Sequence, residues 1–273
     1  RSVCDRSRGI RRRHGQVDAV IKVGVFGAGG RMGATVCHAV HGDADLSLVA
    51  AVDPSYSGID LRTVTGVDAD VKLSRSPAAF ERAGTQVVVD FTDRTAAVEN
   101  LAWCAANGVH AVVGTTGFTD ADLDSFRSQF TRSNCVIAPN FAIGAVLMMH
   151  FAAIAAPYFD SAEIVELHHD NKVDAPSGTA MHTAQLMAAA SKDWTPDPTT
   201  SHVLDGARGG VGPADIHIHS LRMRGLVAHQ EVLLGATGQT LSLRHDSIDR
   251  SSFMPGVLLA VREPSFVIVQ VSA

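Results

Sequence analysis

Short apolar runs alternate with helical patterns through the first half of the chain. The first run, Ile21–Phe26, meets a glycine-rich turn and then the segment ATVCHAV, which has the pattern of a helix. Nearly continuous apolar strands between helices are typical of a parallel sheet covered on both faces. We therefore predict an α/β fold with a Rossmann-like, doubly wound parallel sheet over residues 21–139. Its further strands are predicted at Leu46–Asp53, Val87–Phe91, Val109–Gly114 and Cys135–Ala138, with helices near 93–107 and 119–130.

The pattern changes after Pro139. A long apolar helix, a strand at Ser161–His169 and a helix from about Ser177 to Ala190 precede a loop rich in proline, glycine and aspartate. Three later segments alternate like half-exposed antiparallel strands, namely Asp215–Gly225, Leu226–Gly235 and Gln239–Ser247. These elements predict a second, α+β domain with a mixed open sheet over residues 140–251. We expect a C-terminal helix in about 252–273 to pack back on the first domain, and a closing strand at Phe266–Val271.

Composition and charge narrow the class of protein. Of 273 residues, 46% are hydrophobic and 19% are charged, which is typical of a soluble globular protein. Residues 1–20 hold six of the 23 basic residues and two of the 28 acidic ones, so the rest of the chain has a formal charge of −9. This charge argues against nucleic-acid binding, which needs a basic face. The basic segment could be an arm for nucleic acid or membrane, but we predict a disordered extension.

One stretch, Phe141–Phe159, has no formally charged residue over about the length that spans a bilayer. Its histidine, proline and alanines argue against a membrane segment, so we expect a helix buried between the domains. The sequence starts with Arg and shows no apolar signal segment, which favours a cytoplasmic protein. The four cysteines include no CxxC pair and are predicted to be reduced packing residues.

The glycine-rich turn carries the first candidate chemistry. In GAGGRMG, Gly27, Gly30 and Gly33 are spaced so that backbone N–H groups and the next helix start could hold a pyrophosphate. A structural turn is the alternative, but a strand precedes the loop, a helix follows it, and Asp53 ends the next strand, as in dinucleotide-binding domains. Asp53 would bind the ribose hydroxyls and favours NADH over NADPH, whereas Arg31 could counter a 2′-phosphate.

The densest polar run is EIVELHHDNKVDAPSGTA, residues 163–180, where a predicted strand leads into a predicted helix. A helix that starts near Ser177 offers free N–H groups to an anion, and the hydroxyls of Ser177 and Thr179 add donors. Next to them lie three side chains that can carry positive charge, His168, His169 and Lys172. Together these groups suit a small molecule that is rich in carboxylates.

Each residue of this run also has a purely structural interpretation. His168 or His169 could be packed in the strand, and Lys172 could be solvated. Asp174 or Ser177 could merely cap the helix. His217 and His219 alternate along one strand without a third ligand at a suitable spacing, so we predict no metal site. We also assign no chemistry to His229, or to its near neighbour Glu231.

The polar run resembles the signature of the 4-hydroxy-tetrahydrodipicolinate reductase family, E-[IV]-x-E-x-H-x-x-x-K-x-D-x-P-S-G-T-A, along its whole length. Further blocks that resemble the family follow in the same order, namely GAGGRMG, VVVDFT, VVGTTGF, IAPNFAIGAV and GLVAHQEVLLG, so the likeness runs from about Ile21 to Arg262. Residues 1–20 depart from the family pattern. So does the C-terminal end, where Pro264 interrupts the expected helix.

The resemblance implies a homotetrameric oxidoreductase of the diaminopimelate route to lysine, which uses NADH or NADPH to reduce a cyclic dicarboxylate to tetrahydrodipicolinate. It implies that His168 is the proton donor and acceptor and that Lys172 is the general acid. It implies that the substrate carboxylates bind to His169, Gly178 and Thr179. It places the cofactor at Gly27, Ala28, Gly29, Gly30, Arg31, Met32, Asp53, Gly114, Thr115, Thr116, Ala138, Pro139, Asn140 and Phe141.

Two other functions remain open. One is a different NAD-dependent dehydrogenase, acting for example on amino acids, which a substrate panel would distinguish. The other is a catalytically silent dinucleotide-binding protein, which would need the signature histidine or lysine to be missing. Both residues are present.

Overall fold

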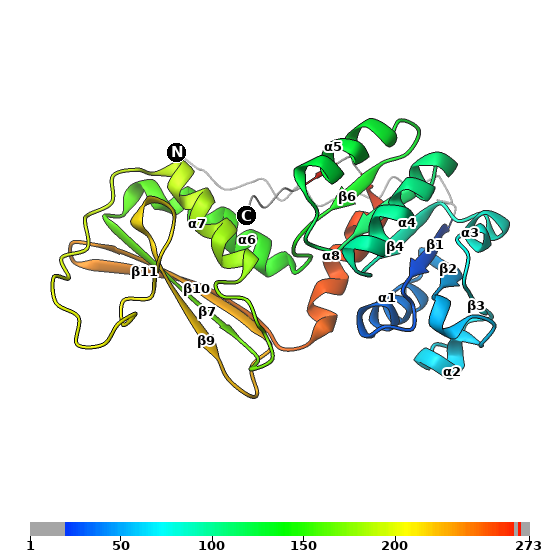
Figure 1. Cartoon of the computed structure of the whole chain (residues 1–273), viewed down its shortest axis with the longest axis horizontal. Coiled ribbons are helices and arrows are strands. Elements are labelled where there is room, and N and C mark those ends of the chain that lie inside the picture. Colours follow the sequence, from blue (N-terminus) through cyan, green and yellow to red (C-terminus); the bar gives the residue numbers. More distant parts are fainter. Residues whose placement is uncertain (1–19, 265–266, 269–273) are drawn as a thin grey trace, which may run out of the picture.

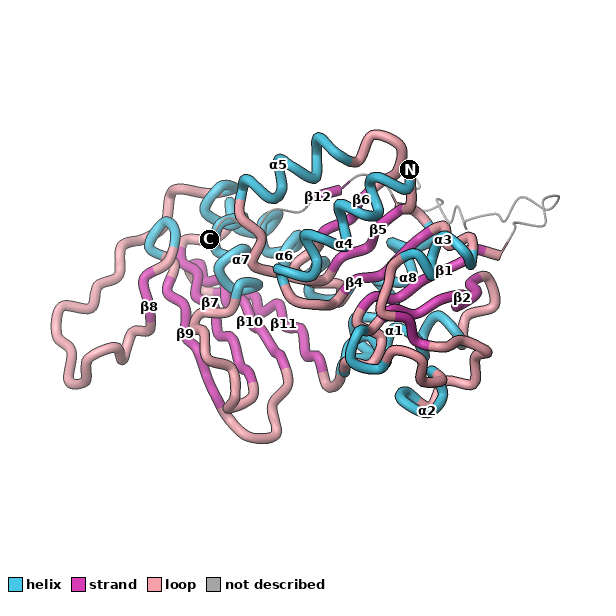
Figure 2. The backbone as a smooth tube through the Cα atoms, turned by 45° about the vertical axis from the view of Figure 1, so that its right-hand side comes forward, coloured by secondary structure: helices cyan, strands magenta, loops and turns pink. Residues whose placement is uncertain are grey.

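The computed structural model of the chain describes residues 20–264 and 267–268. Two β-sheets lie at opposite ends of the molecule (Figure 1), and Figure 2 shows them as two separate groups of strands. The predicted basic extension lies outside the described residues except for Val20, and Cys4 lies outside them as well. The first described element is thus the first predicted strand.

The first sheet has seven strands within the described residues, in the order β12-β6-β5-β4-β1-β2-β3, and all of its pairings there are parallel. The run VVVD forms β4, and all four of its residues are buried. Such a continuous apolar strand suits a parallel sheet in which helices cover both faces. The predicted doubly wound parallel sheet is confirmed. Its strands are β1 (Ile21–Phe26), β2 (Leu46–Val52), β3 (Leu73–Ser74), β4 (Val87–Asp90), β5 (His110–Val113), β6 (Cys135–Ile137) and β12 (Val267–Ile268).

Helices cover both faces of this sheet, each set over its own buried cluster. On one face lie α1 (Arg31–His41), α2 (Leu61–Thr65) and α8 (Met254–Arg262). On the other face lie α3 (Ala78–Ala83), α4 (Arg94–Asn107) and α5 (Asp120–Gln129). Three cysteines are free and buried in these clusters, as predicted: Cys37, Cys104 and Cys135.

The second sheet has the strand order β11-β10-β7-β9-β8, and α6 (Ile143–Ala155) and α7 (Gly178–Ala190) pack on one face of it. The predicted mixed sheet is confirmed, because β10 pairs antiparallel with both β7 and β11. Among the three later strands expected to be antiparallel, β9 instead pairs parallel with β7, which separates it from β10. The reason is that α7 crosses back between β7 and β9, which is the kind of connection that parallel neighbours need. The strands are β7 (Ser161–His168), β8 (Gly210–Val211), β9 (His217–Arg222), β10 (Ala228–Ala236) and β11 (Gln239–Ser247).

The apolar helix α6 is buried on one side only. Ala145, Met148 and Ala152 pack inward, but a second row of apolar side chains is exposed, so the expectation of a buried helix is wrong for that face. The exposed row consists of Ile143, Val146, Leu147, Phe151 and Ile154. No helix among the described residues is both long enough and apolar enough to cross a membrane.

The C-terminal helix α8 returns to the first sheet, where Val257 and Val261 are completely buried. The helix ends at Arg262 rather than continuing toward residue 273, because Pro264 lacks a backbone N–H and restricts the residue before it. Of the predicted closing strand, Val267–Ile268 is found as β12, and the remainder lies outside the described residues. We propose that residues 21–139 with α8 form one domain and residues 140–251 another, since each sheet has its own buried cluster.

Candidate active site

The glycine loop joins β1 to α1 and leaves room for a ligand at the helix start. Gly27 has a φ of +61°, a left-handed conformation that favours glycine, and a Cβ on Gly33 would lie 2.0 Å from the carbonyl oxygen of Gly27. Gly30 precedes α1 without a side-chain capping hydrogen bond, and the first turn holds no acidic residue. The backbone N–H groups at this helix start therefore fit the pyrophosphate of a dinucleotide.

Asp53 follows β2, and its carboxylate lies against the same loop. Its Oδ2 accepts a hydrogen bond from the backbone N–H of Gly29 at 3.0 Å, and its Oδ1 accepts one from Ser55 N at 3.0 Å. Arg31 is exposed at the start of α1. The fold thus brings Asp53 to the glycine loop, as dinucleotide binding requires.

The other predicted cofactor segments, residues 114–116 and 138–141, follow β5 and β6 at the carboxyl edge of the parallel sheet, next to the glycine loop that follows β1. Asp90 ends β4 at this edge and is completely buried. It accepts hydrogen bonds from Thr92 N at 2.8 Å, Thr92 Oγ1 at 2.7 Å, Thr115 Oγ1 at 3.2 Å and Asn100 Nδ2 at 2.8 Å. The sequence interpretation missed Asp90, although an acidic residue at the end of a fully apolar strand was a signal for it.

The segment after β7 holds the predicted chemistry of the second domain. His168 is the last residue of β7, and the Ser177 Oγ accepts a hydrogen bond from Ala180 N at 3.2 Å, so Ser177 does cap α7. Lys172 is not solvated, because its Nζ donates to both carboxylate oxygens of Asp174 at 2.8 Å and its side chain is only 20% exposed. The hydrogen bond from Lys172 lowers the pKa of Asp174.

A small cavity of about 30 Å³ brings the segment that follows β6 next to the polar run. Its lining includes His168, Ser177 and Thr179 from the polar run and Asn140 from the segment after β6. The Asn140 Nδ2 donates to Thr179 Oγ1 at 3.4 Å. One predicted cofactor residue therefore touches one predicted substrate residue. The other two predicted substrate residues, His169 and Gly178, are exposed.

Two histidines that the sequence interpretation left without a role line the same cavity, His229 and His245. His229 Nδ1 pairs with the Asp246 carboxylate at 2.7 Å, and its Nε2 accepts from Val227 N at 3.2 Å. Burial lowers the pKa of His245, with a smaller contribution from His229, and Asp246 opposes the shift. That His229 carries no chemistry stays a prediction, although the residue lines the cavity. The sequence spacing could not predict that these histidines lie near His168. Only the pairing of β10 with β7 brings β10 and β11 to this site.

His168 contacts an ion pair that Glu166 forms with Arg222. Glu166 is completely buried on the same face of β7, and its carboxylate contacts His168 and, through two hydrogen bonds, Arg222 of β9. The sequence interpretation did not assign these two residues. A signal was available in the sequence. Side chains alternate between the two faces of a strand, so Glu166 faces inward like Ile164 and His168 on either side of it.

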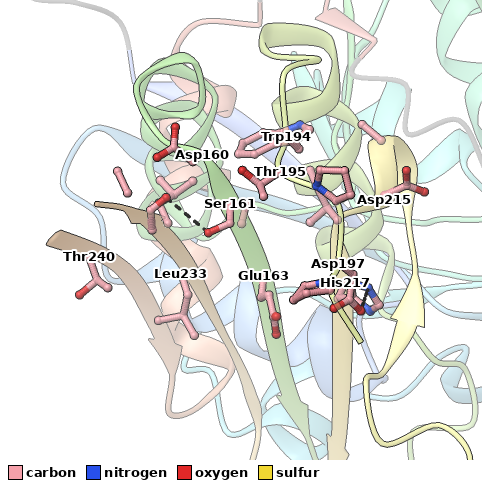
Figure 3. A pocket seen from close by; sticks show the side chains of 18 of the residues that line it. Asp160, Ser161, Glu163, Trp194, Thr195, Asp197, Asp215, His217, Leu233 and Thr240 are labelled. Atoms are coloured by element: carbon pink, nitrogen blue, oxygen red, sulfur yellow. Dashed lines mark hydrogen bonds and ion pairs between the residues drawn. The ribbon is translucent and has the colours of Figure 1, made fainter. Parts of the chain in front are cut away.

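A larger cavity, about 790 Å³, lies elsewhere in the second sheet region (Figure 3). Glu163, Asp197 and His217 line it, and two of these groups pair with Arg208, which donates to Glu163 at 2.7 Å and to Asp197 at 3.1 Å. His219 also donates to Glu163, at 2.7 Å. Among the residues that the structure describes, no group of three or more His, Cys, Asp or Glu side chains could hold a metal ion.

Comparisons with known proteins agree with this geometry. Residues 21–141 match the family model of the dihydrodipicolinate reductase N-terminus, and residues 144–270 match that of its C-terminus. The 4-hydroxy-tetrahydrodipicolinate reductase of Mycolicibacterium vanbaalenii is 52% identical over 247 residues, covering 89% of this chain and 93% of that protein. The same enzyme of Cutibacterium acnes is 52% identical over 250 residues, covering 89% and 92%.

A solved structure extends the likeness to the fold. The dipicolinate-bound dihydrodipicolinate reductase from Paenisporosarcina sp. TG-14 superposes with a TM-score of 0.79 at 39% identity, covering 91% of this chain and 97% of that one. Both family models and these relatives together span the two sheets and the polar run. The chain therefore belongs to the dihydrodipicolinate reductase family, whose members are also named 4-hydroxy-tetrahydrodipicolinate reductases.

Proposed function

We propose that this protein reduces 4-hydroxy-tetrahydrodipicolinate to tetrahydrodipicolinate with a nicotinamide cofactor, in the diaminopimelate route to lysine. The observation that carries the proposal is the contact of Asn140 with Thr179, which joins a dinucleotide-type sheet edge to the polar run that holds His168 and Lys172. Relatives with this activity in their names share about half of the residues along most of the chain.

The ring hydroxyl leaves as water together with a hydrogen from the neighbouring ring carbon, and one hydride and one proton then add across the double bond that this elimination leaves. A nicotinamide cofactor, when bound, supplies the hydride. His168 lines the small cavity and serves as proton donor and acceptor in this proposal, and Lys172 in the next loop serves as general acid. These two groups protonate the electron-rich ring that hydride addition leaves.

The start of α7 holds the two carboxylates of the substrate in this proposal. Free N–H groups at a helix start attract anions, and Gly178 and Thr179 are the first two residues of this helix. His169 follows β7 and is the third group proposed to bind the carboxylates. A Cβ on Gly178 would meet no atom within 4 Å, so this backbone is open to a ligand. Fixing both carboxylates keeps the ring at attack distance from the hydride donor.

A direct assay tests the proposal. Purified protein with enzymatically generated 4-hydroxy-tetrahydrodipicolinate should consume NADH or NADPH, and a panel of amino and hydroxy acids should not. Turnover of a panel member alone would favour a different dehydrogenase. Cofactor binding without turnover of any substrate would favour a catalytically silent protein.

We further propose that both NADH and NADPH are used, with NADH at least as effective, because the Asp53 carboxylate would repel a 2′-phosphate. Asp53→Asn should raise the ratio of kcat/KM for NADPH to that for NADH at least about fivefold, since two like charges about 4 Å apart repel by about 1 kcal/mol even in bulk water. The amide keeps the shape and an acceptor for Gly29 N. Paired steady-state kinetics measure the ratio.

Asp60→Asn is the matched control for this change. The Asp60 carboxylate, like that of Asp53, accepts a hydrogen bond from a backbone N–H two residues later, that of Arg62. Among the described residues it has no hydrogen bond to the glycine loop. Its substitution should leave the coenzyme ratio within about twofold. A ratio that Asp53→Asn does not move would show that this carboxylate does not select the coenzyme.

Assembly and location complete the proposal. We propose a cytoplasmic homotetramer that assembles through the second sheet. The support is that α6 and α7 pack on one face of this sheet, while Leu233 of β10 is 37% exposed. Light scattering at the concentration of the assay would measure the number of subunits.

A further inference from the structure

Glu166 is the most deeply buried charged group near the proposed proton donor. Its side chain is 0% exposed, and it lies two positions before the last residue of β7. Burial is the largest influence on its pKa and would raise it, but hydrogen bonds from His168, Arg222 and Ser220 outweigh burial and lower the pKa to about 2. Glu166 is therefore a carboxylate at neutral pH and can only accept hydrogen bonds.

The contacts of this carboxylate reach three elements of the site. Its Oε2 accepts from His168 Nδ1 at 2.5 Å and from Arg222 Nη1 at 2.9 Å. Its Oε1 accepts from Arg222 Nη2 at 2.8 Å and from the backbone N–H of Ser177 at 3.2 Å. One buried group thus binds the end of β7, the start of α7 and the end of β9.

Arg222 extends these contacts to the loop that carries Lys172. Its Nη2 also donates to the backbone carbonyl of Asp174 at 2.7 Å, and the Asp174 carboxylate accepts from Lys172 Nζ at 2.8 Å. The two side chains assigned to proton transfer are therefore connected to the same carboxylate. His168 contacts it directly, and Lys172 reaches it through Asp174 and Arg222.

We propose that Glu166 is the positioning residue of this site, which holds His168 in the tautomer that keeps a proton on Nδ1 and leaves Nε2 to exchange the proton with the substrate. The assignment of Nε2 rests on the proposed reductase function, whereas the tautomer does not. Because the ionised Glu166 is an acceptor, the nitrogen that faces it must carry a proton.

The proton balance follows from this arrangement. When His168 donates, the Nε2–H bond breaks, its electron pair stays on Nε2, and the proton joins the reduced ring. The neutral imidazole that remains still donates Nδ1–H to Glu166, so the ring does not need to turn. A proton from solvent then restores the imidazolium.

The tautomer can be tested on the unaltered protein, without substrate. Nitrogen-15 NMR of imidazole-labelled full-length chain distinguishes protonated from unprotonated ring nitrogens, and the signals of His168 are those that disappear in His168→Gln. We expect the neutral form of His168 to be protonated on Nδ1. A neutral His168 protonated on Nε2 overturns the proposal, even if Glu166 variants fail to fold.

Kinetics test the consequence for turnover, and Glu163 provides a matched control. Glu163 lies on the same strand, and it too accepts from an arginine and a histidine, Arg208 and His219, but on the opposite face of the sheet. Glu166→Gln should lower kcat at least about a hundredfold, as expected when a general acid is misplaced, and leave the dissociation constant of NADH within about threefold. Glu163→Gln should leave kcat within about threefold.

Each outcome has a defined meaning. A Glu166→Gln protein that keeps at least a third of the wild-type kcat overturns the proposal, and so does an equal loss in Glu163→Gln. Loss of the Nδ1-protonated form in folded Glu166→Gln supports it. If wild-type protein turns over no substrate, the proposed function fails, while the NMR result still decides whether Glu166 sets the tautomer of His168.

Discussion

Lys172→Met should lower kcat at least about a hundredfold, while the dissociation constant of NADH stays within about threefold. A positioned general acid contributes about 10² to 10⁴ in rate, and methionine removes the ammonium group while it retains most of the apolar stem. The effect should fall on kcat because the lysine lies in the loop after β7 and not at the glycine loop that the dinucleotide would contact. Steady-state kinetics and cofactor titration measure the two quantities separately.

Two further variants show which property of Lys172 matters. Lys172→Arg keeps a positive charge that can pair with Asp174, but guanidinium does not release its proton in proteins, so this variant should be as slow as Lys172→Met. Lys192→Met removes a lysine at the lining of the larger cavity and should leave kcat unchanged. Full activity of Lys172→Arg would mean that the charge suffices and that Lys172 gives up no proton.

Gly33→Ala should weaken dinucleotide binding more than about tenfold and lower the free energy of unfolding by about 1–3 kcal/mol, the usual cost of overpacking. The added Cβ would lie 2.0 Å from the Gly27 carbonyl oxygen and 2.8 Å from Ala28 Cα. Both are backbone atoms, so they can move away only if the glycine loop changes shape. Chemical denaturation and calorimetric titration with NADH measure the two effects.

Gly42→Ala is the control at the other end of α1. Gly42 has a φ of −79°, which alanine adopts without strain, and a Cβ there would lie 3.3 Å from the His38 carbonyl oxygen. We expect its unfolding free energy to change by less than about 1 kcal/mol, with unchanged NADH binding. If Gly33→Ala behaved like this control, α1 would not need close contact with the loop.

Local order along the chain made much of the site predictable. His168, Lys172, Ser177 and Thr179 lie within one strand-to-helix connection, so their proximity follows from short sequence separation. The glycine loop and Asp53 were predictable for a similar reason, because a strand, a turn, a helix and a second parallel strand form one supersecondary unit.

Long-range pairing decided the rest. Arg222 reaches Glu166 across 56 residues only because β9 pairs parallel with β7, a pairing that the predicted mixed sheet did not specify. His229 lies at the cavity because β10 pairs with the other edge of β7. The local hydrophobic pattern predicts neither pairing. It indicates which face of a strand is buried, but not which other strand lies beside it.

The sequence by itself determined the class of the first sheet and the glycine loop, because periodicity and short motifs act over a few residues. The residues proposed for proton transfer and carboxylate binding came from the resemblance of the polar run to the family signature. Only the tertiary structure decided which groups support them. Glu166 and Asp90 are completely buried acidic side chains, and such burial is costly without partners. Those partners, among them Arg222 and Asn100, come from other elements of the fold. The burial of a charged group is stabilised by hydrogen-bond partners that the fold brings from other elements, and the local sequence does not specify those partners.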